Sequence, residues 1–482
     1  MKNPIARIWL SALLLGLLLV SCERFFDPKI ENQLSEAEAY SDYLSTRAAV
    51  DGLYTQLQDL MTSYVVTGEL RGDMLRPNDW ANTDLQAIFS LNYNSGNAYF
   101  AGRTAYTAIA NCNDVIWHLE NLMERGTTYD EKLYSMHAEA VLLRTWVNFY
   151  LMRTFGQVPY ITASYTAEGN TTSIEDWLAG HSGDPVETGQ LISEVESVIP
   201  FLIPSEISES QYFNLASAWA MLGELYLWDD DYSQAIDALL ASVNTGGGSR
   251  FILDKDLENN KWQNIFKGDE SATDEIMTKI IFSKAEKQEN ELMPLFSAIA
   301  QGGMQLSPVE QFVIEIEGSY RFDGTYKNGG EVGKYTRSLD APYTSDMPVI
   351  LYRAADVHLM LAEAYTRIGQ IELALQLVNN GSDTLFTAAS KGVRGRIGLP
   401  PVTLEGNSLA DSMLNMEDLI LGERSLEMAY EGKRWFDILR IGKRRNDPDY
   451  IGNMMLKRYE SPDSARIKAF FSDPGNWYLP LE

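Results

Sequence analysis

The sequence predicts a mainly α-helical protein, a scaffold of helical hairpins with long inserted loops and little β-structure. Two observations support this fold class. Apolar residues recur at spacings of three and four through most of the chain, which is the pattern of amphipathic helices. Between residues 244 and 349 this spacing stops, and paired glycines and aromatic residues replace it, as is typical of structured loops.

Composition and charge exclude several classes of protein. The 482 residues are 45% hydrophobic and 22% charged, which is ordinary globular usage and argues against global disorder. A formal net charge of −28 repels phosphate backbones and anionic lipid surfaces, so we expect no nucleic-acid partner. Two cysteines cannot build a disulfide framework, and four scattered histidines offer little for a zinc centre. We therefore predict no metal and no cofactor.

The N-terminus carries an export signal. Lys2 and Arg7 precede an apolar run, residues 8–20, that is too short to span a bilayer comfortably. The run leads into Ser21 and Cys22, which resembles the processing site of bacterial lipoproteins. We predict cleavage after residue 21 and lipidation of Cys22; an ordinary signal peptide or a short anchor with an incidental cysteine is the alternative.

Helical periodicity then predicts helices over residues 35–60, 100–123, 133–155 and 187–198. The third ends at Phe155-Gly156-Gln157-Val158-Pro159, with glycine and proline in the usual C-terminal order. Cys112 and three histidines fall within helical patterns, so we expect all four to be packed: Cys112, His118, His137 and His358.

Two later segments match a known helical repeat. The first places Trp219, Leu222, Gly223, Tyr226 and Ala235 at the tetratricopeptide spacing, in which a small residue lets two helices approach closely. The second shares that spacing at the residues Leu361, Ala362, Tyr365 and Ala374. The two segments are not tandem, because residues 244–349 separate them. We therefore predict two tetratricopeptide-like hairpins of one fold, with chance similarity of ordinary hairpins as the alternative.

The inserted region should carry loops and short β-runs on one face of the scaffold, such as residues 275–282. Loops held by a rigid scaffold are where binding residues concentrate. This region offers four tyrosines as candidate ligand contacts: Tyr320, Tyr326, Tyr335 and Tyr343. For each one alone, packing within the loops is the competing interpretation.

Near the C-terminus, charged residues recur at helical spacing. Arg424 and Glu427 can pair on one helix, and Glu431, Arg434, Asp437 and Arg440 line one side of the next. We interpret them as a charge network that locks the last helices to the scaffold; a catalytic cluster is the alternative. Residues 229–231, three aspartates, lack calcium-loop spacing and are read as a solvated loop. No Gly-x-Ser-x-Gly, HExxH or P-loop motif is present, so we predict no enzyme activity.

The order of these motifs carries a family resemblance. The lipoprotein site is followed by segments at residues 138–144, 155–159, 353–357, 422–427, 430–440 and 477–480. Together they resemble the SusD/RagB family of outer-membrane nutrient-binding lipoproteins, over essentially the whole chain. The resemblance implies one SusD-like domain at residues 22–482, with the scaffold at about 35–243 and 350–445 and the inserted loops at about 244–349.

The resemblance also implies a function. Such proteins sit on a SusC-like TonB-dependent barrel transporter and pass it oligo- or polysaccharide, or peptide in RagB-like members, from a lipid anchor in the outer membrane. Their ligand contacts often include an acid and an arginine that correspond here to Asp73 and Arg76. Aromatic faces stack on sugars, so we add Trp80 and Tyr99; family members often carry a tryptophan near the latter, where this sequence has none. A binder of other polymers and a lipid-anchored hydrolase remain as alternatives.

Overall fold

The computed structural model describes residues 39–481 apart from short gaps at 127–129, 170–172, 181–182, 203–209, 246–260, 267–274, 298–302, 317–320, 328–329, 337–345, 383–384, 387–390, 446 and 459–462. The chain divides into two units, Met1–Ala49 and Val50–Glu482. The predicted signal peptide and Cys22 lie outside the described residues, as do Tyr320 and Tyr343. No described helix is both long enough and apolar enough to cross a membrane.

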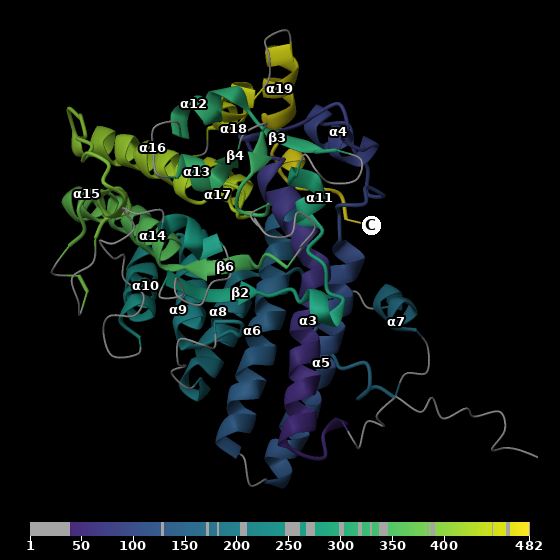
Figure 1. Cartoon of the computed structure of the whole chain (residues 1–482). Helices are drawn as coiled ribbons and strands as arrows, with labels where there is room; N and C mark the ends of the chain where they lie inside the picture. Colours follow the sequence, from purple (N-terminus) through teal and green to yellow (C-terminus); the bar gives the residue numbers. More distant parts are fainter. Residues whose placement is uncertain are drawn as a thin grey trace, which may run out of the picture. The chain divides into compact units, whose positions relative to one another are not determined.

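The N-terminal part of the chain forms long helices and short connecting ones: α3 (Tyr43–Glu69), β1 (Leu75–Pro77), α4 (Thr83–Ser90), α5 (Gly102–Arg125), α6 (Asp130–Phe155), α7 (Ile174–Gly180), α8 (Thr188–Val198) and η1 (Ile199–Phe201). Within the second unit, α6 packs against α5 and α8 (Figure 1). The helices predicted at 100–123, 133–155 and 187–198 are confirmed. The first prediction, 35–60, is wrong at both ends. Residues 40–42 form a turn and α3 begins only at Tyr43, and the helix continues to Glu69 because its last two turns are still buried.

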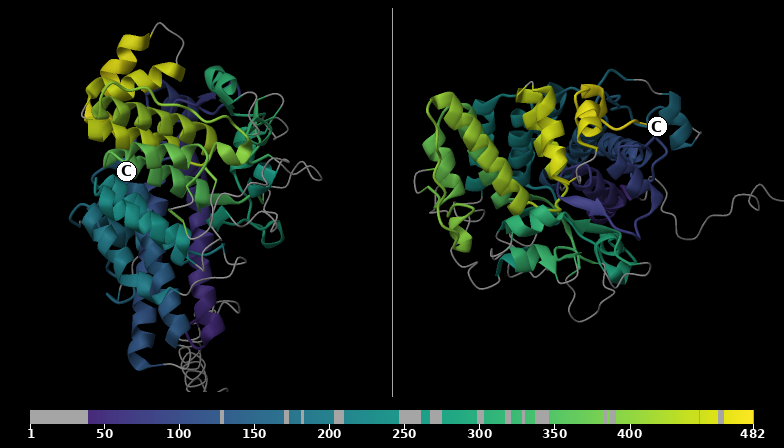
Figure 2. Two further views of the ribbon diagram at one scale, coloured as in Figure 1. Left: turned by 90° about the vertical axis from the view of Figure 1, so that its left-hand side faces the viewer. Right: turned by 90° about the horizontal axis from the view of Figure 1, so that it is seen from above.

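Two helical hairpins carry the repeat-like segments. The first is α9 (Leu215–Trp228) with α10 (Tyr232–Asn244), and the second is α14 (Ala354–Arg367) with α15 (Ile371–Val378). Helix α10 packs against α14, so the hairpins are neighbours although the inserted region separates them in sequence (Figures 1 and 2). A Cβ atom at Gly223 would lie 2.5 Å from Cδ2 of Leu239, which confirms the predicted close approach of the helices.

The inserted region forms short elements rather than a separate layer: η4 (Lys261–Phe266), β2 (Ile276–Ile280), η6 (Lys284–Glu286), α11 (Leu292–Phe296), β3 (Leu306–Pro308), α12 (Glu310–Ile316), α13 (Phe322–Thr325), β4 (Tyr326–Lys327), β5 (Glu331–Val332) and β6 (Val349–Arg353). The β-run predicted at 275–282 is strand β2, which pairs antiparallel with β6. Two further antiparallel pairs, β1 with β3 and β4 with β5, lie near each other through β3 and β5.

The C-terminal part packs short and long helices onto this scaffold: η7 (Gly395–Ile397), α16 (Leu409–Glu427), α17 (Arg434–Arg445), α18 (Pro448–Met455), η8 (Leu456–Arg458), α19 (Ser464–Phe471) and η10 (Pro474–Trp477). The charge network predicted there is confirmed, but its pairing differs. Arg424 binds Asp356 at 2.8 Å and Asp437 at 2.7 Å rather than Glu427. Arg440 reaches Glu363 at 2.7 Å, which joins α17 to α14.

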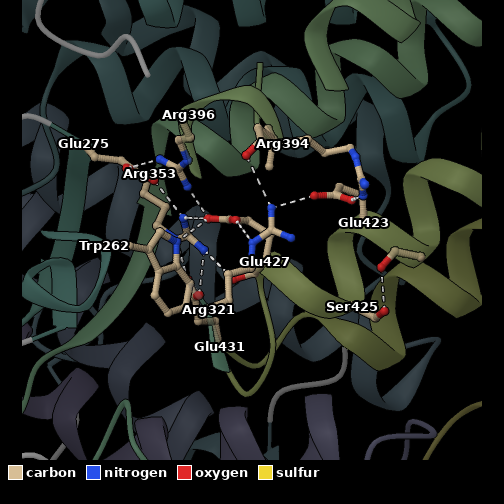
Figure 3. Close-up of polar contacts among 12 residues, drawn as sticks. Trp262, Glu275, Arg321, Arg353, Arg394, Arg396, Glu423, Ser425, Glu427 and Glu431 are labelled. Carbon is tan, nitrogen blue, oxygen red and sulfur yellow. Dashed lines mark hydrogen bonds and ion pairs between the residues drawn. The ribbon is translucent and has the colours of Figure 1, made fainter. Parts of the chain in front are cut away.

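Glu427 stands at the centre of a second, fully buried part of this network (Figure 3). Its carboxylate accepts hydrogen bonds from Trp262 Nε1 at 3.0 Å, Arg321 Nε at 2.6 Å and Arg353 at 2.8 Å, and from Arg396. Burial opposes ionisation of Glu427, but these guanidinium groups outweigh it and hold its pKa well below the usual value. The network therefore fixes the inserted region to the C-terminal helices.

Candidate ligand-binding surface

The segment after α3 begins inside the protein and ends on its surface. Asp73 is 5% exposed, and its two carboxylate oxygens accept from Arg434 at 2.6 and 2.8 Å. Burial would raise the pKa of Asp73, but Arg434 outweighs it and lowers that pKa. The prediction that Asp73 contacts ligand is therefore wrong for this structure. This part of the segment belongs to the core, since Leu70 and Leu75 are also buried.

Strand β1 brings the segment to the surface. It pairs with β3 in the register Leu75–Pro308, Arg76–Ser307 and Pro77–Leu306, which leaves Arg76 exposed. Trp80 follows one turn later and is 70% exposed. Its backbone N–H donates to Asn78 Oδ1 at 3.1 Å, and the N–H of Asn78 donates to the Gln305 carbonyl at 3.0 Å. Trp80 therefore lies on a turn whose backbone is hydrogen-bonded to Gln305, the residue that precedes β3.

The ring of Trp80 rests against the chain that enters β3. A Cβ atom at Gly303 would lie 3.1 Å from Trp80 Cγ, and Gly303 has a φ of +81°, a conformation that favours glycine. One ring face therefore meets backbone while most of the indole remains exposed. A large apolar ring held this way is preorganised for stacking on a ligand, because little conformational entropy is lost on binding.

Tyr99 lies beside the same turn. Its hydroxyl accepts from Asn82 Nδ2 at 2.9 Å, and the N–H of Asn82 donates to Gln305 Oε1 at 3.2 Å. Burial raises the pKa of Tyr99, so the phenol keeps its proton and can donate a hydrogen bond. Tyr99 is therefore joined through Asn82 to Gln305, the residue whose backbone carbonyl also holds the turn that carries Trp80.

Tyr326 reaches this surface from the inserted region. It begins β4, which pairs with β5 next to β3. A Cβ atom at Gly330 would lie 3.1 Å from Met304 Cε and 4.0 Å from the Tyr326 hydroxyl. The Tyr326 hydroxyl and the Met304 side chain therefore both approach Gly330, and Met304 directly follows Gly303, against which Trp80 rests. We call the surface formed by Arg76, Trp80, Tyr99, Met304, Gln305 and Tyr326 the Trp80 surface.

Three of the predicted contacts are not assigned to this surface: Tyr320, Tyr335 and Tyr343. Tyr335 is 4% exposed, stacks on Phe296 at 5.6 Å and donates to the Tyr430 carbonyl at 2.7 Å, so its prediction as a ligand contact is wrong. Tyr320 and Tyr343 lie outside the described residues. Gln305 and Met304 were missed, because an amide and a methionine in a loop carry no signal of their own until strand pairing places them.

The predicted packed cysteine and histidines and the predicted aspartate loop can be compared directly with the structure. Cys112 and His358 are buried, while His118 and His137 are half-buried in α5 and α6. Residues 229–231 form the exposed turn between α9 and α10. Within the described part of the chain, no group of three His, Cys, Asp or Glu side chains is arranged to hold a metal ion.

A groove of about 1170 Å³ lies elsewhere in the second unit. Its walls include the aromatic residues Tyr93, Phe155, Trp228, Phe470 and Tyr478. Among the predicted ligand contacts that the structure describes, none lines it. This groove has room for a long ligand, so it is the alternative location for the ligand-binding site.

Comparisons with known proteins agree with this architecture. The family described as "Starch-binding associating with outer membrane" matches residues 25–227, and the SusD family matches residues 314–482. Two SusD-like proteins of Formosa agariphila are each 22% identical to this chain, covering 88% and 97% of it and 89% and 95% of their own lengths.

Solved structures share the fold at low identity. A SusD superfamily protein from Bacteroides vulgatus aligns with a TM-score of 0.67 at 18% identity, covering 89% of this chain and 92% of its own. A laminarin-binding SusD-like protein aligns with a TM-score of 0.65 at 18% identity, covering 91% and 96%. The two family matches lie on either side of the inserted region, and the relatives extend across it. Over residues 25–227 and 314–482 the chain is therefore similar to the SusD family.

Proposed function

We propose that this protein captures oligo- or polysaccharide at the Trp80 surface and delivers it to a SusC-like TonB-dependent transporter of the outer membrane. The observation that carries the proposal is the exposure of Trp80: an indole that is 70% exposed, yet held against the backbone at Gly303. Buried packing does not account for such a ring, since most of its surface faces solvent. Stacking of a ligand on the indole would account for its exposure.

The groups around Trp80 suit a sugar. Sugars present apolar C–H faces and a rim of hydroxyls, so a site needs aromatic rings together with polar side chains. Tyr99 and Tyr326 supply rings with hydroxyls, Gln305 supplies an amide, and Arg76 supplies hydrogen-bond donors. The description of the matched family and the laminarin-binding relative support a glucan as the first ligand class to test.

The anchor and the partner are further parts of the proposal. Lipidation at Cys22 would hold the protein at the outer membrane, and the transporter would receive what the Trp80 surface has bound. A capture protein of this kind performs no chemistry. Support for that comes from the two family matches.

The test measures binding to soluble starch and laminarin by affinity gel electrophoresis and calorimetry. Replacing Trp80 by alanine should weaken binding about tenfold or more, because losing a stacked ring costs about 1–2 kcal/mol. The matched control is Tyr134→Ala, which removes a ring that is 37% exposed on α6. It should bind as wild type does, and both variants should keep the wild-type melting temperature.

Two results would contradict the proposal. Unchanged affinity of Trp80→Ala for a polymer that wild type binds moves the site elsewhere, with the 1170 Å³ groove as the next location. Binding of peptides without binding of any glycan replaces the ligand class and favours a RagB-like function.

The anchor has its own test, which is independent of the ligand. The variant Cys22→Ser lacks the thiol that an acyl-glyceryl group modifies, so it should not incorporate labelled fatty acid and should leave the membrane fraction. Continued labelling and membrane retention would show that Cys22 is not the anchor.

A further inference from the structure

The groove of about 1170 Å³ contains an aromatic ring that is held in the same way as Trp80. Gly156 has a φ of +83°, and a Cβ atom at that position would lie 3.0 Å from Cγ of Tyr478. For Gly303 and Trp80 the same two values are +81° and 3.1 Å. In both places a glycine, which tolerates this backbone conformation, lets a ring lie directly against the backbone. A ring fixed in this way loses little conformational entropy when a ligand stacks on it.

Tyr478 is also accessible to a ligand. It is half-buried, and it lines the groove together with Gly156. The N–H of the next residue, Leu479, donates to the Thr154 carbonyl at 2.8 Å, which ties this part of the chain to the end of α6. The Tyr478 hydroxyl makes no hydrogen bond with another described residue. Burial raises the pKa of this phenol, so at neutral pH it keeps a proton that it can donate to a ligand oxygen.

The rest of the groove has the composition that a sugar requires. Half-buried Tyr93 and Phe470 add two rings whose centroids are 6.5 Å apart. The exposed side chains of Gln157, Lys443 and Asp229 add donors and acceptors for hydroxyl groups. The volume lies above the range of about 300–1,000 Å³ found for small-molecule sites, which favours a chain of several sugar residues over a single one.

Helix α4 connects this groove to the Trp80 surface. The helix packs against β1, and its N-cap residue Asn82 donates to the Tyr99 hydroxyl at 2.9 Å. At the other end of α4, Leu91 lines the groove, and Arg466 of α19 donates to the Ser90 carbonyl at 3.2 Å. The eight residues of α4 span about 12 Å, so a chain of several sugar residues has the length to reach from one place to the other, whereas a disaccharide is too short.

These observations point to one site in two parts. We propose that the groove is a second glycan-binding site, at which Tyr478 stacks on a further stretch of the chain that Trp80 binds. The proposal rests on the proposed function, because it takes the Trp80 surface as the first part of the site. Binding of a chain at the first part raises its effective concentration at the second, so long glycans bind more tightly than short ones.

The test compares laminarin and soluble starch with laminaribiose and maltose. Tyr478→Leu keeps an apolar group against Gly156 but removes the ring and the hydroxyl. Gly189→Phe fills the groove instead, because Gly189 lines it and nothing lies within 4 Å of a Cβ atom there. By calorimetry, each variant should bind the polymers about tenfold more weakly than wild type, since the second part of the site is lost.

The disaccharides report on the Trp80 surface alone. In protein labelled with 5-fluorotryptophan, the Trp80 signal is assigned by its loss in Trp80→Phe. The disaccharide that wild type binds should shift this signal with the same affinity in Tyr478→Leu and Gly189→Phe as in wild type. Calorimetry of Trp80→Ala with the polymers tests the proposed function in the same series.

The matched controls are Tyr134→Leu on α6 and Gly52→Phe on α3, where nothing lies within 4 Å of a Cβ atom either. Both should bind the polymers as wild type does. The two-part site is overturned, and the Trp80 surface stands alone, if either Tyr478→Leu or Gly189→Phe binds the polymers as wild type does while Trp80→Ala binds them more weakly. It is also overturned if either groove variant loses the disaccharide shift.

Failure of the proposed function gives a different pattern. If Trp80→Ala binds the polymers as wild type does, the Trp80 surface is not a glycan site, and weaker binding by Tyr478→Leu then makes the groove the whole site. If wild type binds none of the four glycans, both proposals are wrong.

Discussion

At the scale of single residues, Asp73 shows why residue type alone does not identify a contact. An acid and an arginine three positions apart read as a polar surface pair in the sequence. In the structure Asp73 points inward to Arg434, while Arg76 is exposed on β1. The partner of Asp73 lies 361 positions away along the chain, a distance at which no local pattern can report it.

Replacing Asp73 by alanine should therefore act on stability. It would leave the Arg434 guanidinium buried without its carboxylate, and breaking a buried pair in this way costs about 3–5 kcal/mol. Urea denaturation measures the loss, with Asp79→Ala, at a neighbouring exposed carboxylate, as the near-neutral control. If Asp73→Ala is as stable as wild type but binds polymer more weakly, Asp73 contributes to the ligand-binding site instead.

At the scale of elements, periodicity predicted helices well and strands partly. Helices α5, α6 and α8 follow from apolar residues three and four apart, because each buries one continuous face against its neighbours. The strand pair β1–β3 is three residues long on each side and joins segments that are more than 200 residues apart. Its pairing creates the Trp80 surface, so the surface could not be assembled from sequence although Arg76, Trp80, Tyr99 and Tyr326 were each identified.

The contact between α9 and α10 gives a prediction at this scale. In Gly223→Ala the new methyl group would meet Leu239 at 2.5 Å, and this overpacking should lower the free energy of unfolding by about 1–3 kcal/mol; Gly223→Leu should cost more. The control is Gly422→Ala on α16, where nothing lies within 4 Å of the added carbon. That variant should be neutral or more stable by up to about 1 kcal/mol, since alanine favours helix. Equal melting temperatures for the two alanine variants would contradict the close packing at Gly223.

At the scale of the whole molecule, buried charge pairs connect elements that lie far apart in the sequence. Arg440 and Arg444 of α17 reach Glu363 of α14, and Arg353 of β6 reaches Glu427 of α16. The sequence predicted that such a network exists because the charges recur at helical spacing. The sequence could not predict which charges pair, because each guanidinium could bind any of several carboxylates. The packing of the helices determines which of them lie together.

This network makes stability depend on pH in the acid range. Burial would raise the pKa of Glu363, but Arg440 and Arg444 outweigh it and hold that pKa well below its ordinary value of 4.5. The folded protein therefore keeps Glu363 ionised at a pH where the unfolded chain has already taken up a proton. Its contribution is complete above pH 4.5 and declines as the pH falls, by at most about 1.4 kcal/mol per pH unit.

The variant Glu363→Gln isolates that contribution. It should be less stable than wild type at pH 7, because two buried guanidinium groups lose a charged partner. Between pH 4.5 and the acid limit of folding, its free energy of unfolding should fall less steeply than that of wild type, so the two curves converge. Urea denaturation at a series of pH values measures both slopes, and Glu310→Gln, at an exposed carboxylate, should follow wild type throughout. Parallel curves for Glu363→Gln and wild type would show that the ionisation of Glu363 is not what the fold loses in acid.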